Sequence, residues 1–266
     1  MKLSVFYDHI LQAAEQTGKS LPELLLEAKN AGIDAVEINM TYLNEHEETY
    51  ALLKAAQLAV SCVYEFYAMD SRDETERARR HVATAKKAGS SKILVVPGFF
   101  PEAASSYTAC IHDYGQTATF LEQNEKARRM AKGMEKLVAM AKAENIQTVI
   151  EDFDSIDSPI ACVNGMRWFL EQIPDLRAAF DTGNFIIHHE NIFTAWRALK
   201  DKVTHVHCKD RGEQSVAVGD GYIPMKEILG EILASGYDGY FAIEHFDAED
   251  QERCMIRSAQ FLKQTF

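Results

Sequence analysis

The chain has 266 residues, 47% of them hydrophobic, so it can bury a large core. Acidic residues outnumber basic ones 40 to 28, and the resulting net charge of −12 is spread along the chain. Because phosphate binding needs a concentrated basic patch, this balance disfavours a nucleic-acid partner. The five cysteines are scattered without a CxxC pair, which disfavours both a disulfide framework and a thiolate zinc site.

The first residues run from Met1 directly into an apolar segment without the pattern of a signal peptide. Nowhere is an apolar run long enough to span a bilayer. We therefore expect a cytoplasmic protein that has no membrane partner and acts on small polar molecules.

Short runs of β-branched and aromatic residues alternate with longer amphipathic segments, which is typical of βα units. The expected strands are 3–7, 35–39, 60–66, 92–97, 147–153, 177–181, 203–209 and 240–246. The expected helices are 21–31, 48–57, 73–88, 125–144, 164–172, 192–200, 224–234 and 249–264. This alternation continues without a linker, so we expect a single domain over residues 1–266.

Eight strands and eight helices in a chain of this length predict a (β/α)8 TIM barrel. The motifs GxGxxG and GxxxxGKS/T are absent, which disfavours a dinucleotide site and a P-loop. The longest insertion, residues 98–124, reads as irregular and follows the fourth strand. In a barrel such a loop lies over the catalytic face, and we expect it to form a lid.

Acids and one histidine stand near the carboxyl ends of the last four expected strands: Glu151, Asp181, His207 and Glu244. Each alone would more often be a capping acid or a core histidine. Because side chains alternate along a strand, however, all four should point into the barrel mouth, where three carboxylates repel one another. A divalent cation removes this conflict, and the O and N donors suit Mn²⁺, Mg²⁺, Co²⁺ or Zn²⁺. His205, one layer deeper, is expected to be structural or to support His207.

Several short motifs keep a characteristic order along the chain. They are GIDAVEI at 32–38, Glu151, DTGN at 181–184, HVHCKD at 205–210, GDGYIP at 219–224 and GYDGYFAIE at 236–244. With these motifs the chain resembles the xylose isomerase-like TIM-barrel superfamily, which includes ketose 3-epimerases, inosose dehydratases and hydroxypyruvate isomerases. The resemblance implies that Glu151, Asp181, His207 and Glu244 bind one metal ion, and that Glu151 and Glu244 also transfer protons. It also implies a homo-oligomer.

The chemistry expected of this site is proton removal next to a carbonyl, because a cation stabilises the oxyanion that develops. We therefore expect a metal-dependent sugar isomerase or epimerase that forms an enediolate from a small ketose, a sugar phosphate or a related polyol ketone. An inosose-type dehydratase on the same metal site is an alternative, since Asn184 stands where ketose 3-epimerases have a histidine. Two further alternatives are a non-catalytic sugar-binding barrel and an endonuclease IV-like DNA repair enzyme, which the acidic charge, Asn184 and His205 disfavour.

Five further residues are candidates for substrate contact: Glu37, Asn184, His188, Lys209 and Arg211. Lys209 and Arg211 offer positive charge, with ion pairs to neighbouring acids as the alternative role. Glu37 would either hold a substrate hydroxyl or be a buried structural acid. Asn184 and His188 follow the sixth strand, and a solvated loop is the alternative for His188.

Overall fold

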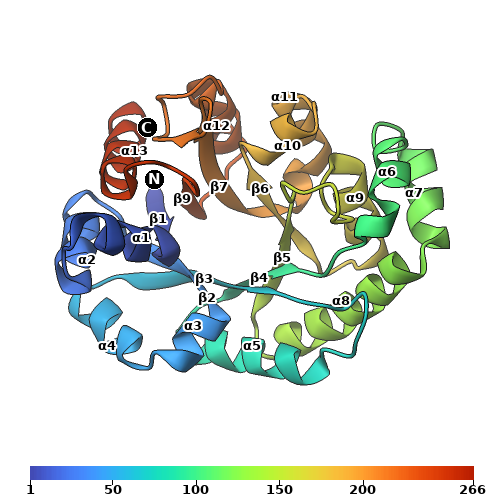
Figure 1. Ribbon diagram of the computed structural model, residues 1–266, viewed down its shortest axis with the longest axis horizontal. Coiled ribbons are helices and arrows are strands. Elements are labelled where there is room, and N and C mark those ends of the chain that lie inside the picture. Colours follow the sequence, from blue (N-terminus) through green and yellow to red (C-terminus); the bar gives the residue numbers. More distant parts are fainter.

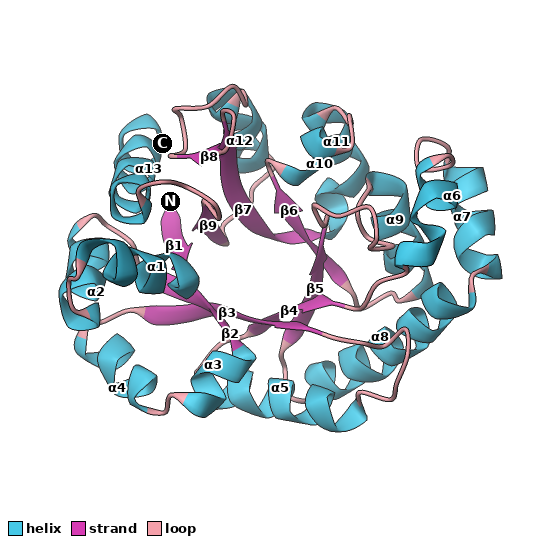
Figure 2. Ribbon diagram, in the orientation of Figure 1, coloured by secondary structure: helices cyan, strands magenta, loops and turns pink.

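The computed structural model describes residues 1–266, and eight parallel strands form a closed barrel inside a ring of helices (Figures 1 and 2). The barrel strands are β1 (Lys2–Phe6), β2 (Ala35–Asn39), β3 (Ala59–Phe66), β4 (Lys92–Val96), β5 (Gln147–Glu151), β6 (Arg177–Asp181), β7 (Val203–Arg211) and β9 (Tyr240–Glu244). β1 pairs with both β2 and β9, and β6 pairs with β7, which closes the sheet. The predicted (β/α)8 barrel is confirmed.

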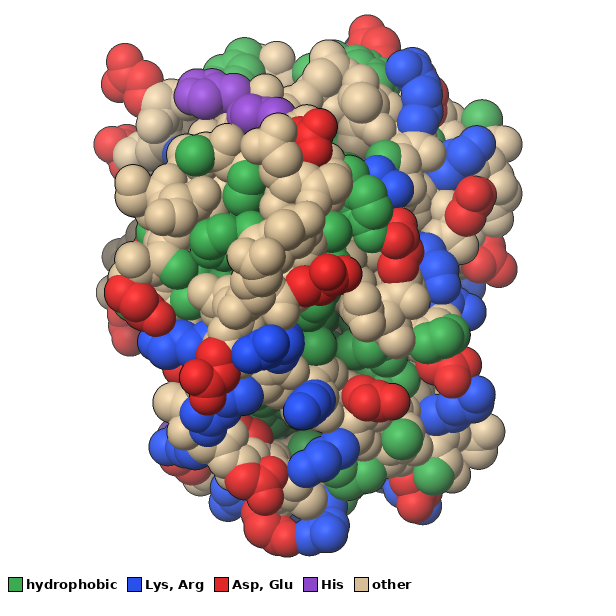
Figure 3. Space-filling view, turned by 90° about the vertical axis from the view of Figure 1, so that its right-hand side faces the viewer, with side chains coloured by type: hydrophobic (Ala, Val, Ile, Leu, Met, Phe, Trp, Pro, Cys, Tyr) green, Lys and Arg blue, Asp and Glu red, His purple; other side chains and the backbone are tan.

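The helices surround the barrel. They are α1 (Tyr7–Thr17), α2 (Leu21–Asn30), α3 (Met40–Glu45), α4 (Glu48–Ala55), α5 (Thr75–Lys87), α6 (Ala104–Thr108), α7 (Tyr114–Gln123), α8 (Glu125–Ala143), α9 (Val163–Gln172), α10 (Asn184–Ile187), α11 (Ile192–Leu199), α12 (Met225–Ala234) and α13 (Gln251–Thr265). In α8 an apolar stripe through Met130, Met134 and Leu137 is buried, as expected for an amphipathic helix on a sheet. On the flank at the right of Figure 1, acidic and basic side chains are intermixed over the outer surface (Figure 3). None of the helices has the length and hydropathy of a membrane span.

All expected strands and helices are present, and their ends differ from the expectation by at most two residues. The sequence did not predict α1 and α3, which follow β1 and β2 without an intervening loop. It also did not predict β8 (Ser215–Val216), a short strand that pairs antiparallel with the end of β7. These additions all lie just after strands, at the carboxyl end of the barrel.

Residues 98–124 were wrongly expected to be irregular, because they contain α6 and α7. The side chains of Asp113 and Asn124 accept backbone N–H groups in the first turns of α7 and α8. Tyr107 is fully buried and donates its hydroxyl to the carbonyl oxygen of Pro159 at 2.6 Å. Much of this segment thus belongs to the helix layer, and its role as a lid stays a prediction.

Two apolar clusters occupy the two faces of the strands. The larger one, with residues such as Val63, Ile150 and Phe180, lies between the barrel and the helices. The smaller one comes from the alternate strand positions, which face the barrel interior: Phe6, Cys62, Tyr64, Leu94, Val96, Val149, Ala179 and Ala242. The interior cluster is small because other inward positions are polar, and these polar side chains form the site described next.

Candidate active site

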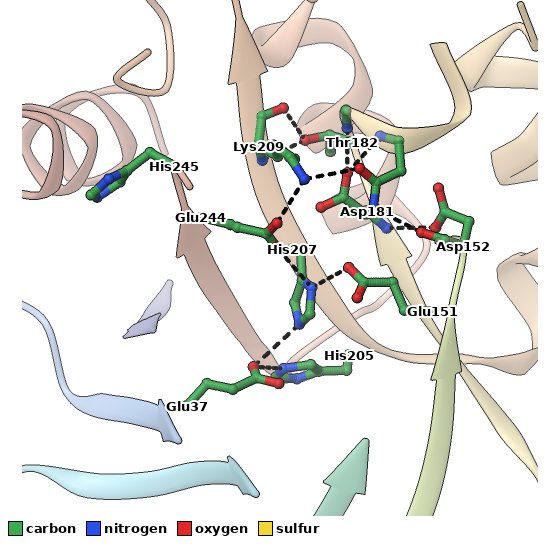
Figure 4. Close-up of polar contacts among 12 residues, drawn as sticks. Glu37, Glu151, Asp152, Asp181, Thr182, His205, His207, Lys209, Glu244 and His245 are labelled. Carbon is green, nitrogen blue, oxygen red and sulfur yellow. Dashed lines mark hydrogen bonds and ion pairs between the residues drawn. The ribbon is translucent and has the colours of Figure 1, made fainter. Parts of the chain in front are cut away.

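Four predicted ligand residues converge at the carboxyl end of the barrel (Figure 4). Glu151, Asp181 and Glu244 are the last residues of β5, β6 and β9, and His207 lies within β7. One ligand atom from each lies within 4.8 Å of all the others, and all four residues are buried. Strand register creates this proximity, because it places Asp181 beside His207 and Glu244 beside Lys209.

Glu37 orients His207 through a hydrogen bond to its imidazole ring. His205 donates its Nε2–H to Glu37 Oε2 at 2.7 Å, and His207 donates its Nε2–H to the same oxygen at 3.2 Å. Nδ1 of His207 faces the carboxylates, in contact with Glu151 Oε1 and 3.2 Å from Glu244 Oε2. Burial lowers the pKa of His207, but Glu151 and Glu37 outweigh this effect and raise the pKa well above its usual value. Burial raises the pKa of Glu37, but its interactions with His207 and His205 outweigh this effect and lower the pKa.

The carboxylates of the cluster lie in different electrostatic surroundings. Burial raises the pKa of Asp181 well above its usual value, and the charge of Glu244 adds to the effect. Burial likewise raises the pKa of Glu151. For Glu244 the effect of burial is outweighed by Lys209 and His207, which lower the pKa. Lys209 Nζ lies 2.8 Å from Glu244 Oε1 and donates to Asn184 Oδ1 at 2.9 Å.

Unpartnered oxygens in the cluster fit a divalent cation. Asp181 Oδ1 accepts the backbone N–H groups of Gly183 at 2.6 Å and Asn184 at 2.7 Å, but its buried Oδ2 has no hydrogen-bond partner. Oε2 of Glu244 is also buried, and its one polar neighbour is Nδ1 of His207 at 3.2 Å, which makes no well-aligned hydrogen bond to it. Buried oxygens without a partner are costly, and a cation among three carboxylates and an imidazole would satisfy them. The residues present therefore fit the predicted metal ion.

A cavity of about 280 Å³ opens next to the cluster. Its lining includes Glu151 and Glu244, but not Asp181 or His207. The complete lining is Phe6, Tyr64, Phe66, Leu94, Val96, Glu151, Phe153, Asp154, Asn184, Lys209, Glu244 and Phe246. Two of the four clustered residues thus face the space where a substrate would bind, and the other two lie behind them.

The structure separates the predicted substrate-binding residues into two groups. Asn184 and Lys209 line the cavity. Glu37 is fully buried and hydrogen-bonded to the two imidazoles, an arrangement that favours the alternative of a buried structural acid. Arg211 belongs to the hairpin with β8, His188 directly follows α10, and neither lines the cavity. Substrate contacts of these last two residues stay predictions.

Sequence reasoning missed two parts of the site. Asp152 is fully buried, and its Oδ1 accepts the backbone N–H of Asp181 at 3.1 Å. The aromatic part of the cavity lining was also missed: Phe6, Tyr64, Phe66, Phe153 and Phe246. The sequence does carry a signal for this aromatic wall. Phe6 and Phe66 are the last residues of β1 and β3. Phe153 and Phe246 stand two residues after the glutamates that end β5 and β9.

The fold and the cluster define a TIM barrel with a carboxylate and imidazole site at its strand ends. A family model described as "Xylose isomerase-like TIM barrel" matches residues 25–265. The chain therefore belongs to this family, as its resemblance indicated.

Two curated relatives align with part of the chain. Fructoselysine 3-epimerase of Escherichia coli O157:H7 is 25% identical over 122 residues, which cover 44% of each protein. Inosose dehydratase of Lacticaseibacillus casei is 23% identical over 141 residues, which cover 46% of this chain and 47% of that protein. The matched part spans less than half the length of either relative.

Among solved structures, a D-allulose 3-epimerase from Methylomonas sp. in complex with D-allulose has a TM-score of 0.77. It is 14% identical, and the match covers 100% of this chain and 97% of that one. This similarity supports the fold over the whole chain.

Proposed function

We propose that this protein is a divalent-metal-dependent sugar isomerase or epimerase. It would remove a proton next to the carbonyl of a small ketose, a sugar phosphate or a related polyol ketone. One observation carries the proposal: of the four clustered residues, only Glu151 and Glu244 line the cavity.

Glu151, Asp181, His207 and Glu244 would hold the cation, for which Mn²⁺, Mg²⁺, Co²⁺ and Zn²⁺ are all suitable. When bound, the cation stabilises the negative charge that develops on the substrate oxygen. Asp181 and His207 act only in holding it, since neither lines the cavity.

The two glutamates are the proton-transfer groups in this proposal. They come from different strands, β5 and β9, so they approach a bound substrate from different sides. The ion pair with Lys209 favours the ionised form of Glu244, which can accept a proton, and Glu151 lines the same cavity. A proton taken on one side and returned on the other inverts the carbon, and return to the neighbouring carbon isomerises the sugar.

Dehydration is the second candidate reaction. It begins with the same deprotonation and continues with loss of a hydroxyl from the next carbon. The similarity to an inosose dehydratase favours it, and so does Asn184, which replaces the histidine expected in a ketose 3-epimerase.

Proton exchange in deuterated water tests the assignment of the glutamates. We expect Glu151→Gln and Glu244→Gln each to slow deuterium uptake by ketoses and inososes at least about 100-fold, because each removes a proton carrier. Cation binding, measured by calorimetry, should be weaker but present. The matched control is Glu171→Gln, which changes an exposed carboxylate of α9 that does not line the cavity and should exchange at near the wild-type rate. Near-normal exchange in either glutamine variant would reject the assignment.

A further inference from the structure

A second cavity, of about 330 Å³, lies between α5 and α8 in the helix layer outside the barrel. It shares no lining residue with the cavity next to the cluster. The charged side chains around it are Arg72, Arg129, Lys132 and Lys136, which are basic, and Asp73 and Glu74, which are acidic. This cavity is thus surrounded by excess positive charge in a protein whose net charge is −12.

Three basic residues of α8 line this cavity without an acidic partner. Arg129, Lys132 and Lys136 are exposed, and no carboxylate oxygen lies within 4.0 Å of their charged nitrogens. A lysine near each end of the same helix, in contrast, pairs with an acid at 2.8 Å. Because residues three, four and seven positions apart share one face of a helix, the three unpaired cations repel one another. A bound anion would relieve this repulsion.

The two acids of the lining are held by other donors. Oε1 of Glu74 accepts from Arg72 Nε at 2.7 Å and from the backbone N–H of Ala68 at 3.1 Å. Oδ1 of Asp73 accepts the backbone N–H of Thr75 at 3.2 Å and its hydroxyl at 2.6 Å. Helix α5 begins at Thr75, which also lines the cavity, so the positive end of the helix dipole adds to the charge of the α8 cations.

Gly133 lets the loop before α5 approach α8 closely. A Cβ at position 133 would lie 2.8 Å from Met69 Sδ and 3.2 Å from Met69 Cβ. Glycine lowers the stability of a helix interior relative to alanine, and here it allows the buried Met69 to pack on the helix. Both residues line the cavity, which contains no aromatic side chain. The cations therefore surround a shaped hollow in which charge, and not stacking, would select a ligand.

From these observations we infer that the cavity between α5 and α8 binds a small molecule that carries two phosphate groups. At 1.5 Å per residue, Arg129 and Lys136 arise about 10 Å apart along α8, so the two phosphate groups can bind near the two ends of the row. Arginine binds a phosphate through paired N–H groups, and lysine binds it as a point charge. The inference does not depend on the proposed function, because the two cavities share no residue.

The probe for this site is α-D-glucose 1,6-bisphosphate, whose phosphorylated C1 cannot open to a carbonyl. Calorimetric titration of the purified protein at about 0.15 M salt measures its dissociation constant, beside that of α-D-glucose 1-phosphate. We expect the bisphosphate to bind at least about tenfold more tightly, because it reaches more of the cations. No binding of the bisphosphate, or equal affinity for the two compounds, overturns the inference.

Two double variants of α8 separate a specific site from a general effect of charge. Lys132→Gln/Lys136→Gln removes two cations of the cavity, and Lys126→Gln/Lys142→Gln removes two cations of the same helix outside it. All four side chains reach solvent, so the fold should be retained, which a thermal melt checks. We expect bisphosphate binding to weaken about 5- to 30-fold in the first variant and less than about twofold in the second. Equal weakening in both would contradict the site.

Asp73→Asn gives a test whose expected result is a gain of binding, which a damaged fold cannot produce. Asparagine keeps a side-chain oxygen for Thr75 but removes a negative charge from the cavity. We expect the bisphosphate to bind about two- to fivefold more tightly. Glu15→Gln, which removes an exposed acid of α1, is the control and should bind as the wild type does. Unchanged or weaker binding in Asp73→Asn would count against a phosphate site at this position.

Discussion

Glu37 illustrates how a side chain that does not face the cavity can still decide what the site binds. It is fully buried, and one of its oxygens accepts N–H groups from both His205 and His207. A cation on Nδ1 would require a neutral imidazole, in which only one nitrogen carries a proton, and the hydrogen bond to Glu37 would keep that proton on Nε2. Glu37 would therefore act on the metal through the orientation and the tautomer of His207.

We predict that Glu37→Gln weakens Mn²⁺ binding about 10- to 100-fold, because an amide holds the imidazole less well than a carboxylate does. Calorimetric titration of metal-free protein measures the effect without any need for turnover. Asp8→Asn is the matched control, since Asp8 accepts a hydrogen bond from Tyr64 and does not contact His207. A folded Glu37→Gln variant with wild-type affinity would contradict the prediction.

Alternation along single strands was enough to predict that Glu151, Asp181, His207 and Glu244 converge. Alternation could not decide the role of Glu37. An inward-facing side chain reaches the cavity only if it lies in the layer nearest the carboxyl ends of the strands. The layer depends on the register between strands, which here pairs Glu37 with Phe6 and Asp181 with His207. Register arises from the closed barrel as a whole and is not encoded in any one strand.

At the scale of elements, Asp210 anchors the loop that follows the β7–β8 hairpin. Its two oxygens accept backbone N–H groups from Gly219 at 2.9 Å, Gly221 at 3.1 Å and Ile223 at 3.3 Å. A Cβ at position 221 would lie 2.1 Å from Asp210 Oδ1, which explains why glycine stands there. The motif at 219–224 is thus a loop wrapped around one carboxylate.

We predict that Asp210→Asn lowers the free energy of unfolding by about 1–3 kcal/mol, because its amide group would face backbone donors that need an acceptor. Urea unfolding followed by circular dichroism measures the change. Asp220→Asn is a control in the same loop, where a partly exposed pair with Arg257 is lost, and it should cost less than about 1 kcal/mol. Equal losses in the two variants would argue against an anchoring role for Asp210.

His81 couples α5 to β3 in a way that depends on pH. Its Nε2–H donates to the carbonyl oxygen of Val63 at 2.9 Å, and Nδ1 lies 3.0 Å from the hydroxyl of Tyr67. Burial lowers the pKa of His81 to about 4, so the folded protein keeps the neutral ring while the unfolded chain takes up a proton below its ordinary value of 6.5. This contribution to stability is present above pH 6.5 and is lost as the pH falls toward 4, by about 3 kcal/mol.

We predict that the free energy of unfolding of His81→Gln falls less steeply between pH 6.5 and 4 than that of the wild type. Urea unfolding at a series of pH values gives both curves. His46→Gln is the matched control, because the His46 side chain is 44% exposed. Parallel curves for His81→Gln and the wild type would exclude this role for His81.

The helix α7 shows why some elements could not be predicted from local sequence. It contains Gly115, Thr117 and Thr119, all of which have weak helix propensity. Its stability comes from the Asp113 cap and from packing against α8 and α9. Such tertiary support is invisible in the sequence window, whereas the barrel strands are marked by their own apolar runs.

At the scale of the whole molecule, the proposed cation would join the ends of β5, β6, β7 and β9, half of the barrel strands. The carboxylates that meet there repel one another, so a bound cation should stabilise the closed barrel. A ligand that binds only the folded state at about 100 times its Kd adds about 2.7 kcal/mol of stability. For a protein of this size we expect Mn²⁺ to raise the Tm of chelator-treated protein by about 5–10 °C.

Differential scanning calorimetry with and without Mn²⁺ measures this shift. Asp181→Asn removes one charged ligand and relieves part of the repulsion, so its Tm should rise less on addition of the cation. Asp154→Asn keeps all four ligands and should retain the full shift. If chelation and Mn²⁺ leave the Tm of the wild type unchanged, the four strand ends do not share a cation, and their buried carboxylates must be stabilised by protonation and by their contacts with His207 and Lys209.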